Sequence, residues 1–153
     1  MKKISILLVT VLCTVLCCLP ASAVCPAEPA EVIYFEDGSY LEIGAVTEGP
    51  ATRATNTKSG QKSIVYRSES GREIWQATLS ATFTYTGSSA TCTVASITTS
   101  ITDSNWKITE KTATKSGNKA IGDITAKRYF LGIATKTVEQ SVTITCSAAG
   151  VLS

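Results

Sequence analysis

Residues 72–86, "REIWQATLSATFTYT", decide the fold, because apolar and polar side chains alternate along most of the segment. Leu79, Ala81, Phe83 and Tyr85 alternate with small hydroxyl residues. A period of two is typical of a β-strand that has one face in a core and the other in solvent. The segment therefore predicts a long, half-buried strand.

The neighbouring segments repeat this pattern and are joined by short turn sequences. Residues 63–68 ("SIVYRS") lead through "ESG" into the first strand, and "GSS" at 87–89 leads out of it. Residues 119–130 ("KAIGDITAKRYF") and 135–146 ("TKTVEQSVTITC") are also strand-like. Valine and threonine recur and helical periods are missing, so we expect no helix here. The pattern predicts an all-β antiparallel β-sandwich with a single core.

One predicted strand breaks its own alternation. Cys92 and Val94 share one face, whereas Ile97 and Ile101 fall on the other. We expect either a β-bulge near residues 95–96 or a strand that divides and crosses between the sheets there.

The spacing of Cys92, Trp106 and Cys146 resembles that of an immunoglobulin domain, in which a tryptophan packs against an inter-sheet disulfide. Only seven residues follow Cys146, and Ile144 stands at the tyrosine-corner position, so we expect an immunoglobulin-like architecture and no closer relationship. Large aromatic residues on strands are more often core than ligand platform. The residues expected in the core are Trp75, Phe83, Trp106, Val142 and Ile144.

The N-terminus has the pattern of a secretory signal peptide. Lys2 and Lys3 precede an apolar run over 4–19 and the small-residue triplet "ASA" at 21–23. We expect cleavage after residue 23, a secreted or extracellular location, and a remaining domain of 130 residues (153 − 23). Without the two lysines, the formal charge of +2 falls close to zero, so no nucleic-acid-binding face is predicted.

Two alternatives to plain secretion stay open. The apolar run could remain as a membrane helix, although it is somewhat short and ends at Pro20. A lipoprotein signal would place a lipid on Cys25 and anchor the protein to the cell surface, but Val24 is larger than the residue that such signals use. Without that lipid, we expect no membrane contact after cleavage.

Three of the six cysteines (Cys13, Cys17 and Cys18) leave with the signal peptide, which leaves three. Disulfides persist in exported proteins, so we expect a bond between Cys92 and Cys146, with Cys25 unpaired near the new terminus. Three widely spaced cysteines without any histidine lack zinc-ligand spacing. No metal and no cofactor is predicted.

Residues 31–46 ("EVIYFEDGSYLEIGAV") contain two β-rich runs around Asp37-Gly38, which predicts a hairpin with a two-residue type I′ turn. Tyr34, Phe35 and Tyr40 gather on this hairpin and are the candidate surface for a ligand or partner, although cross-strand pairing explains them equally well.

The chain therefore divides into four predicted parts. Residues 47–61 have almost no large apolar side chains and predict a flexible linker. The linker separates an N-terminal segment with the hairpin, residues 24–46, from a β-sandwich domain over 62–153, and the signal peptide covers 1–23.

Several runs together resemble a group of small exported proteins from Gram-positive gut bacteria. These are "YFEDGSYLEI" (34–43), "ATRATNTKSG" (51–60), "IWQATLSATFTYTGSSATCT" (74–93), "SGNKAIGDITAKRYFLGI" (116–133) and "SVTITCSAAGVLS" (141–153). The resemblance covers nearly all of the chain after the signal peptide. It implies export and a β fold, and it carries no activity, partner or site residue with it.

Composition narrows the possible function. The chain has no histidine, which removes histidine-based triads, histidine metal sites and the commonest general base. The carboxylates considered as an acid–base pair are Glu36 and Asp37 at the hairpin tip and Glu69 and Glu73 at the "ESG" turn, where no catalytic pair is predicted. We predict a non-catalytic exported or cell-surface protein that binds an envelope polymer, glycan or partner protein, or is structural; the alternative is a secreted enzyme or toxin-like effector that uses carboxylates. The candidate sugar-binding aromatics are Trp75, Tyr85, Trp106, Tyr129 and Phe130.

Overall fold

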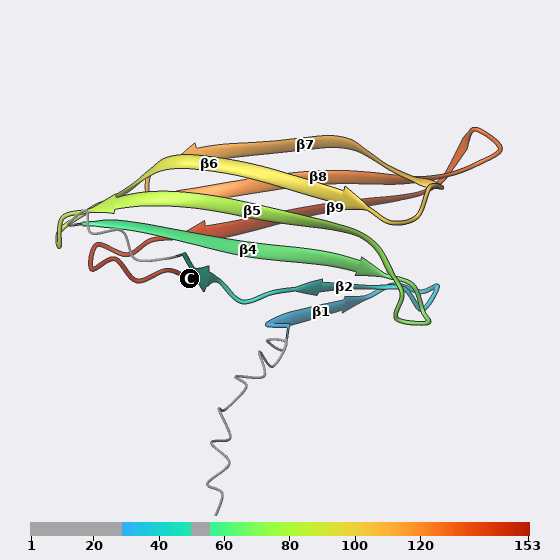
Figure 1. The fold of residues 1–153 in the computed structure, drawn as a ribbon, viewed down its shortest axis with the longest axis horizontal. Coiled ribbons are helices and arrows are strands. Elements are labelled where there is room, and N and C mark those ends of the chain that lie inside the picture. The colour runs from blue at the N-terminus through green and yellow to red at the C-terminus, as the bar shows by residue number, and fades with distance from the viewer. Residues whose placement is uncertain (1–28, 50–55) are drawn as a thin grey trace, which may run out of the picture.

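A computed structural model describes residues 29–49 and 56–153, which contain nine β-strands and no helix (Figure 1). No helix in this part of the chain is therefore available to cross a membrane. The predicted signal peptide and Cys25 lie outside the described residues. The strands are β1 (Glu31–Tyr34), β2 (Tyr40–Ile43), β3 (Thr47–Glu48), β4 (Thr57–Arg67), β5 (Glu73–Tyr85), β6 (Ala90–Ile101), β7 (Trp106–Ser116), β8 (Lys119–Phe130) and β9 (Ile133–Thr145).

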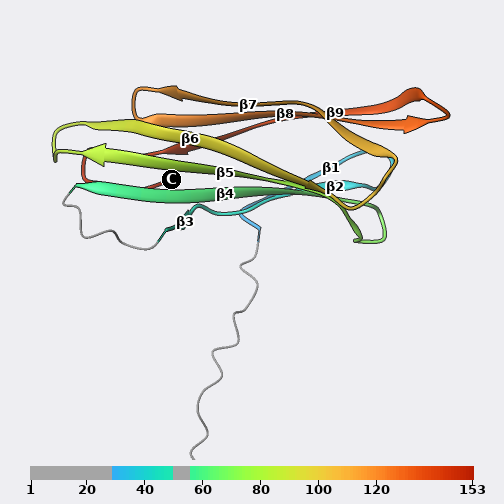
Figure 2. The same ribbon diagram turned by 45° about the horizontal axis from the view of Figure 1, so that its top comes forward.

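The strands form two antiparallel sheets, which confirms the predicted all-β class. One sheet has the order β1-β2-β4-β5-β6, with β3 paired to β4, and the other has the order β7-β8-β9. The sheets lie one over the other, and the chain passes between them at the β6–β7 turn (Figure 2). Sequence neighbours pair throughout most of the structure, so the order is a meander. It differs from the immunoglobulin order, in which the two sheets exchange strands through Greek-key connections.

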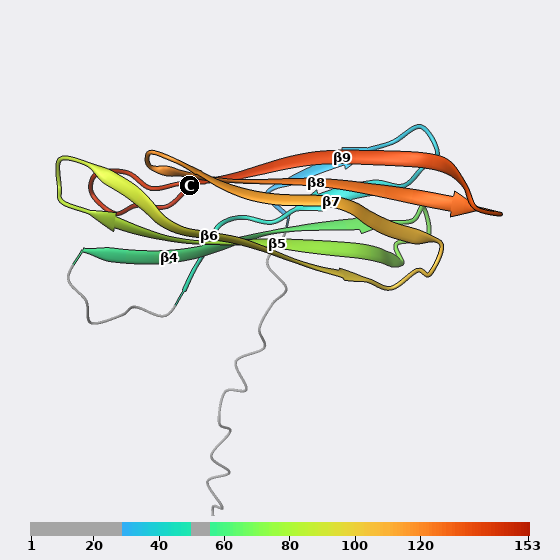
Figure 3. The ribbon, with the colours of Figure 1, turned by 90° about the horizontal axis from the view of Figure 1, so that it is seen from above.

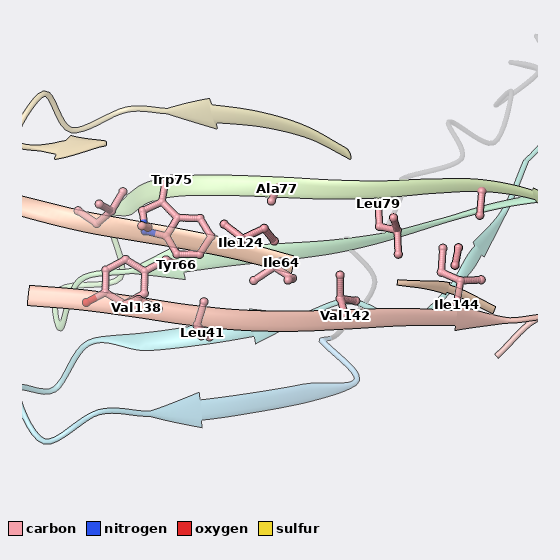
Figure 4. Packing of buried hydrophobic residues seen from close by; sticks show 14 of the residues in the cluster. Leu41, Ile64, Tyr66, Trp75, Ala77, Leu79, Ile124, Val138, Val142 and Ile144 are labelled. Atoms are coloured by element: carbon pink, nitrogen blue, oxygen red, sulfur yellow. The ribbon is translucent and has the colours of Figure 1, made fainter. Parts of the chain in front are cut away.

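The core lies between the two sheets and is built by the strand alternation seen in the sequence. The inward side chains of β4 and β5 meet those of β8 and β9 (Figure 4). The sheets approach closely at Gly122, where an added Cβ would lie 3.2 Å from side-chain atoms of Leu79 and Ile97. The residues expected in the core are all at most 5% exposed: Trp75, Phe83, Trp106, Val142 and Ile144.

The break in the alternation of β6 is a β-bulge. Val94 pairs with Thr82 and Cys92 pairs with Phe83, so Thr93 is the extra residue. Cys92 therefore points into the core, whereas Val94 is 53% exposed. The bulge was predicted two to three residues too late, because Val94 was assigned to the buried face on its apolar side chain alone.

The predicted disulfide between Cys92 and Cys146 is not formed, since both residues are free thiols in the structure. Each backbone NH donates to the β7–β8 turn, Cys92 to the Gly117 carbonyl and Cys146 to the Asn118 carbonyl. The thiols donate to carbonyls of their own chain segments, at 3.2 Å to Val94 and 3.4 Å to Ser147. Burial raises the pKa of both thiols, which keeps them protonated.

Trp106 is buried, but it does not pack where an immunoglobulin tryptophan would. It begins β7, whereas Cys92 is hydrogen-bonded to the turn that follows the other end of β7. At about 3.3 Å per residue, the length of β7 places the two residues roughly 30 Å apart. Between Cys92 and Trp106 the chain runs along β6 and through the β6–β7 turn. The cysteine and the tryptophan therefore lie at opposite ends of the sandwich.

The predicted linker is replaced by strand at both of its ends. Thr47 pairs with Gln61 and Glu48 pairs with Gly60, while β2 pairs with the same edge of β4 further along. The middle of the segment, residues 50–55, lies outside the described residues. The hairpin of β1 and β2 therefore belongs to the same sheet as β4 and β5, and it is not a separate N-terminal unit.

Candidate functional site

The aromatic residues proposed as a surface on the β1–β2 hairpin do not share one face. Tyr34 is 73% exposed, and its ring centroid lies 5.5 Å from that of Tyr40 on the paired strand. Phe35 points the other way and packs edge-on against Tyr66, with 5.8 Å between ring centroids. Tyr34 and Tyr40 are thus a cross-strand pair, and Phe35 belongs to the margin of the core.

The turn of this hairpin also differs from the prediction. Phe35 NH donates to the Ser39 carbonyl, and Gly38 NH donates to the Phe35 carbonyl. Within the described residues, the non-glycine residues with positive φ are Asn56 and Leu131, so Asp37 does not have the φ of a type I′ turn. The loop has three residues, Glu36 to Gly38, and Gly38 takes the left-handed position at φ 77°.

A cavity of about 190 Å³ lies at the end of the sandwich where three turns meet strands of the second sheet. The β1–β2, β4–β5 and β6–β7 turns each contribute a carboxylate, and β8 and β9 contribute cations. The lining residues are Asp37, Ser39, Tyr66, Ser68, Glu69, Arg72, Ile74, Asp103, Trp106, Arg128 and Lys136.

Lys136 connects β9 to the β1–β2 turn across this cavity. Its Nζ donates to Asp37 Oδ2 at 2.6 Å and to Ser39 Oγ at 2.8 Å, and Ser39 Oγ also accepts from the Tyr66 hydroxyl at 2.8 Å. The hydrogen bonds from Lys136 and then Ser39 lower the pKa of Asp37 to about 2. Burial lowers the pKa of Lys136, but its contacts with Asp37 and Tyr66 outweigh that effect and the net shift is upward.

A second carboxylate of the cavity is also held in its ionised form. Asp103 Oδ1 accepts from the Asn105 NH at 2.9 Å, and Asp103 Oδ2 accepts from Arg72 at 2.8 Å. The hydrogen bond from the backbone of Asn105, followed by that from Arg72, lowers the pKa of Asp103. Among the described residues, no group of histidine, cysteine or carboxylate side chains is placed to hold a metal ion.

The hairpin of β8 and β9 extends beyond the body of the sandwich at the same end (Figure 3). We call residues 127–136 the finger. Phe130, Leu131 and Ile133 at its tip are 67%, 87% and 70% exposed. Phe130 pairs with Ile133, and the two residues between them, Leu131 and Gly132, have φ values of 49° and 82°. Two positive φ values in a two-residue loop define a type I′ turn.

Leucine is a poor residue for this turn, because its side chain is strained in the left-handed region. The turn also carries apolar residues at a place where polar residues are the rule. Of the finger, sequence reasoning singled out only Tyr129 and Phe130, as candidate sugar-binding aromatics. The missed signal was the run "YFLGI" at 129–133, which continues apolar through a glycine that turns the chain.

Comparison of the chain with protein-family models, with curated proteins and with solved structures finds no match.

Proposed function

We propose that this chain is a non-catalytic exported β-sandwich protein that binds a component of the cell envelope through the tip of the finger. The exposure of three large apolar side chains, Phe130, Leu131 and Ile133, on one protruding turn carries this proposal. Single exposed apolar residues are ordinary, but a contiguous exposed group is typical of an interaction site. Export rests on the signal-peptide pattern of residues 1–23.

The cavity beside the finger gives little support to the alternative of a carboxylate-based enzyme. An acid–base pair needs two carboxyl groups with separated pKa values, one of them raised. The pKa values of Asp37 and Asp103 are both lowered, and each carboxylate is paired with a cation. The cavity, at about 190 Å³, is also smaller than common small-molecule sites.

The test is binding to isolated Gram-positive cell envelopes. The full-length chain is exported from a bacterial host and purified after processing, and a variant with Phe130→Ser, Leu131→Asn and Ile133→Thr is prepared in the same way. Val151→Asn is the matched control, because Val151 is 62% exposed on the C-terminal turn and lies outside the finger.

We expect the wild-type chain and the Val151→Asn control to sediment with envelopes and the finger variant to stay in solution. Equal sedimentation of all three proteins would show that the finger does not form the binding site. If the wild-type chain binds no envelope fraction, the proposed function is wrong.

A further inference from the structure

The cations at the base of the finger are grouped behind its apolar tip. Lys107 on β7 pairs with Lys127 on β8, and Arg128 on β8 pairs with Lys136 on β9. Because side chains alternate between the faces of a sheet, the first pair lies on one face of the second sheet and the second pair on the other. We call these four residues the collar.

On each face of the finger, an apolar or aromatic residue lies beyond the collar cations in the direction of the tip. Phe130 and Ile133 form the pair beyond Arg128 and Lys136, and Tyr129 lies beyond Lys127. Lys107 Nζ lies 5.4 Å from the centroid of the Tyr129 ring, so this cation stays close to the aromatic side chain that follows it along the finger. Residues 124–138 contain no aspartate or glutamate. The finger is thus apolar at its end and positively charged on both sides behind it.

We propose that the finger inserts its tip into an anionic lipid surface, with the collar cations at the phosphates of the headgroups. This inference rests on the proposed function and names the class of component that the finger binds. Leu131 lies three residue steps beyond Arg128, which corresponds to about 10 Å along the finger. Apolar groups of interfacial proteins enter a bilayer to a depth of about 5 to 10 Å, which matches that separation.

The arrangement of charge favours a lipid surface over a groove on a protein. A groove would meet one face of the finger, whereas a plane of anionic headgroups surrounds an inserted tip and meets cations on both faces. Three of the four collar cations, Lys107, Lys127 and Arg128, have no ion-pair partner among the residues that the structure describes. They are therefore available to phosphate oxygens.

The acidic side chains at this end limit which collar cations can meet a lipid surface. Asp37 and Asp103 are already paired with Lys136 and Arg72. The remaining carboxylates, including Glu36 and Glu69, belong to turns of the first sheet, and the finger extends past those turns (Figure 1). Glu36 and Asp37 lie beside Lys136, so this cation is already engaged by the β1–β2 turn, and Lys107, Lys127 and Arg128 carry the contact with the phosphates.

The experiment measures binding of the processed full-length protein to vesicles of neutral phosphatidylcholine and to vesicles that also contain phosphatidylglycerol. We expect binding to the anionic vesicles and a large loss of binding in about 0.5 M salt, because salt screens the collar. Leu131→Asn should weaken binding by about tenfold through lost apolar burial. Lys107→Gln should weaken it by about fivefold, and Val151→Asn should leave it unchanged.

A second measurement tests insertion directly. In Phe130→Trp, the introduced indole should shift its emission to the blue on vesicle binding and be quenched by brominated acyl chains, since it would lie below the headgroups. A vesicle-bound Phe130→Trp protein whose emission matches that of the unbound protein would overturn insertion.

One result would overturn the inference and leave the proposed function standing. In it, the finger variant loses binding to whole envelopes, the wild-type chain binds no vesicle, and binding is confined to the peptidoglycan wall fraction, which would identify a wall polymer as the partner. A dimer that Leu131→Asn dissociates would make a second copy of the chain the partner of the tip and would overturn the proposed function as well. Equal and salt-independent binding to neutral and anionic vesicles would show that the collar does not contribute to binding, and would overturn the assignment of an anionic surface.

Discussion

The β1–β2 and β8–β9 hairpins lie at the same end of the sandwich, yet their turns follow opposite rules. The first has the sequence Asp37-Gly38, the strongest signal for a type I′ turn, and forms a three-residue loop instead. The second has Leu131-Gly132 and forms the type I′ turn. The first turn is polar and is tied to the body of the protein, while the second is apolar and protrudes. Turn geometry alone does not explain a leucine at a left-handed position, so the β8–β9 turn is the better candidate for a binding surface.

The largest effect is expected below both hairpins, at Trp106. This side chain is 5% exposed, and its ring centroid lies 4.9 Å from that of Tyr66, the residue on which Phe35 also packs. Trp106→Ala should lower the free energy of unfolding by about 3 to 5 kcal/mol through lost burial and the cavity left behind. Chemical denaturation checks this. An unchanged unfolding midpoint would show that Trp106 does not stabilise the end of the sandwich from which the two hairpins extend.

The first turn should be intolerant of a side chain at Gly38. Its φ is 77°, and a Cβ there would lie 2.9 Å from Cγ of Glu69. The Glu69 side chain can move, so the backbone strain decides the effect. Gly38→Ala should lower stability by about 1 to 2 kcal/mol, measured by thermal unfolding. Gly87→Ala is the comparison, because Gly87 has a similar φ of 87° and nothing lies within 4 Å of an added Cβ there. If Gly87→Ala leaves the unfolding temperature unchanged, backbone strain at Gly38 is not the cause.

The second turn should respond in the opposite direction. Leu131 is 87% exposed with φ 49°, so its replacement removes strain and little packing. Leu131→Asn should raise the free energy of unfolding by up to about 1 kcal/mol, because asparagine tolerates the left-handed region. The same variant should bind vesicles about tenfold more weakly, so it separates binding from folding. A loss of stability in Leu131→Asn would contradict the contrast between the two turns.

The smallest effect is expected for the contact that joins the hairpins, Lys136 to Asp37. Half of the Asp37 side chain is exposed, so Asp37→Asn should cost less than about 1 kcal/mol. The pKa of Asp37 is lowered from 3.8 to about 2, so the contribution is present above pH 3.8 and is lost as the pH falls from there toward 2. The unfolding curves of the two proteins should therefore approach each other through that interval and coincide only below the folded pKa of about 2. A difference that persists well below that pKa would show that the contact acts through shape and not through charge.

The strands were predictable because a period of two is a local property. Leu79, Ala81 and Phe83 are buried as their alternation predicts. The position of the bulge was not predictable in the same way. Threonine is compatible with either face, so the sequence around Thr93 does not reveal which residue lacks a partner.

The cavity and the finger were harder to predict. The cavity depends on contacts between residues that are far apart in the sequence. Lys136 and Asp37 are 99 residues apart and meet only because two hairpins end at the same place. The spacing between Cys92 and Trp106 was interpreted by analogy, and the long β6 and β7 strands placed the two residues at opposite ends instead. The finger was missed because its apolar turn looks like an uninterrupted strand when hydrophobicity alone is considered.

The meander has a consequence for how the chain folds. Five of its strand pairs join consecutive strands through short turns, so most of the backbone pairing can form between residues that are near each other in sequence. All-β domains with distant pairings fold slowly, in milliseconds to seconds, because long loops must close first. Here each hairpin can form by itself within microseconds, and the closure of one sheet over the other at the β6–β7 turn remains as the slow step. The transition state should therefore contain formed hairpins and an open core.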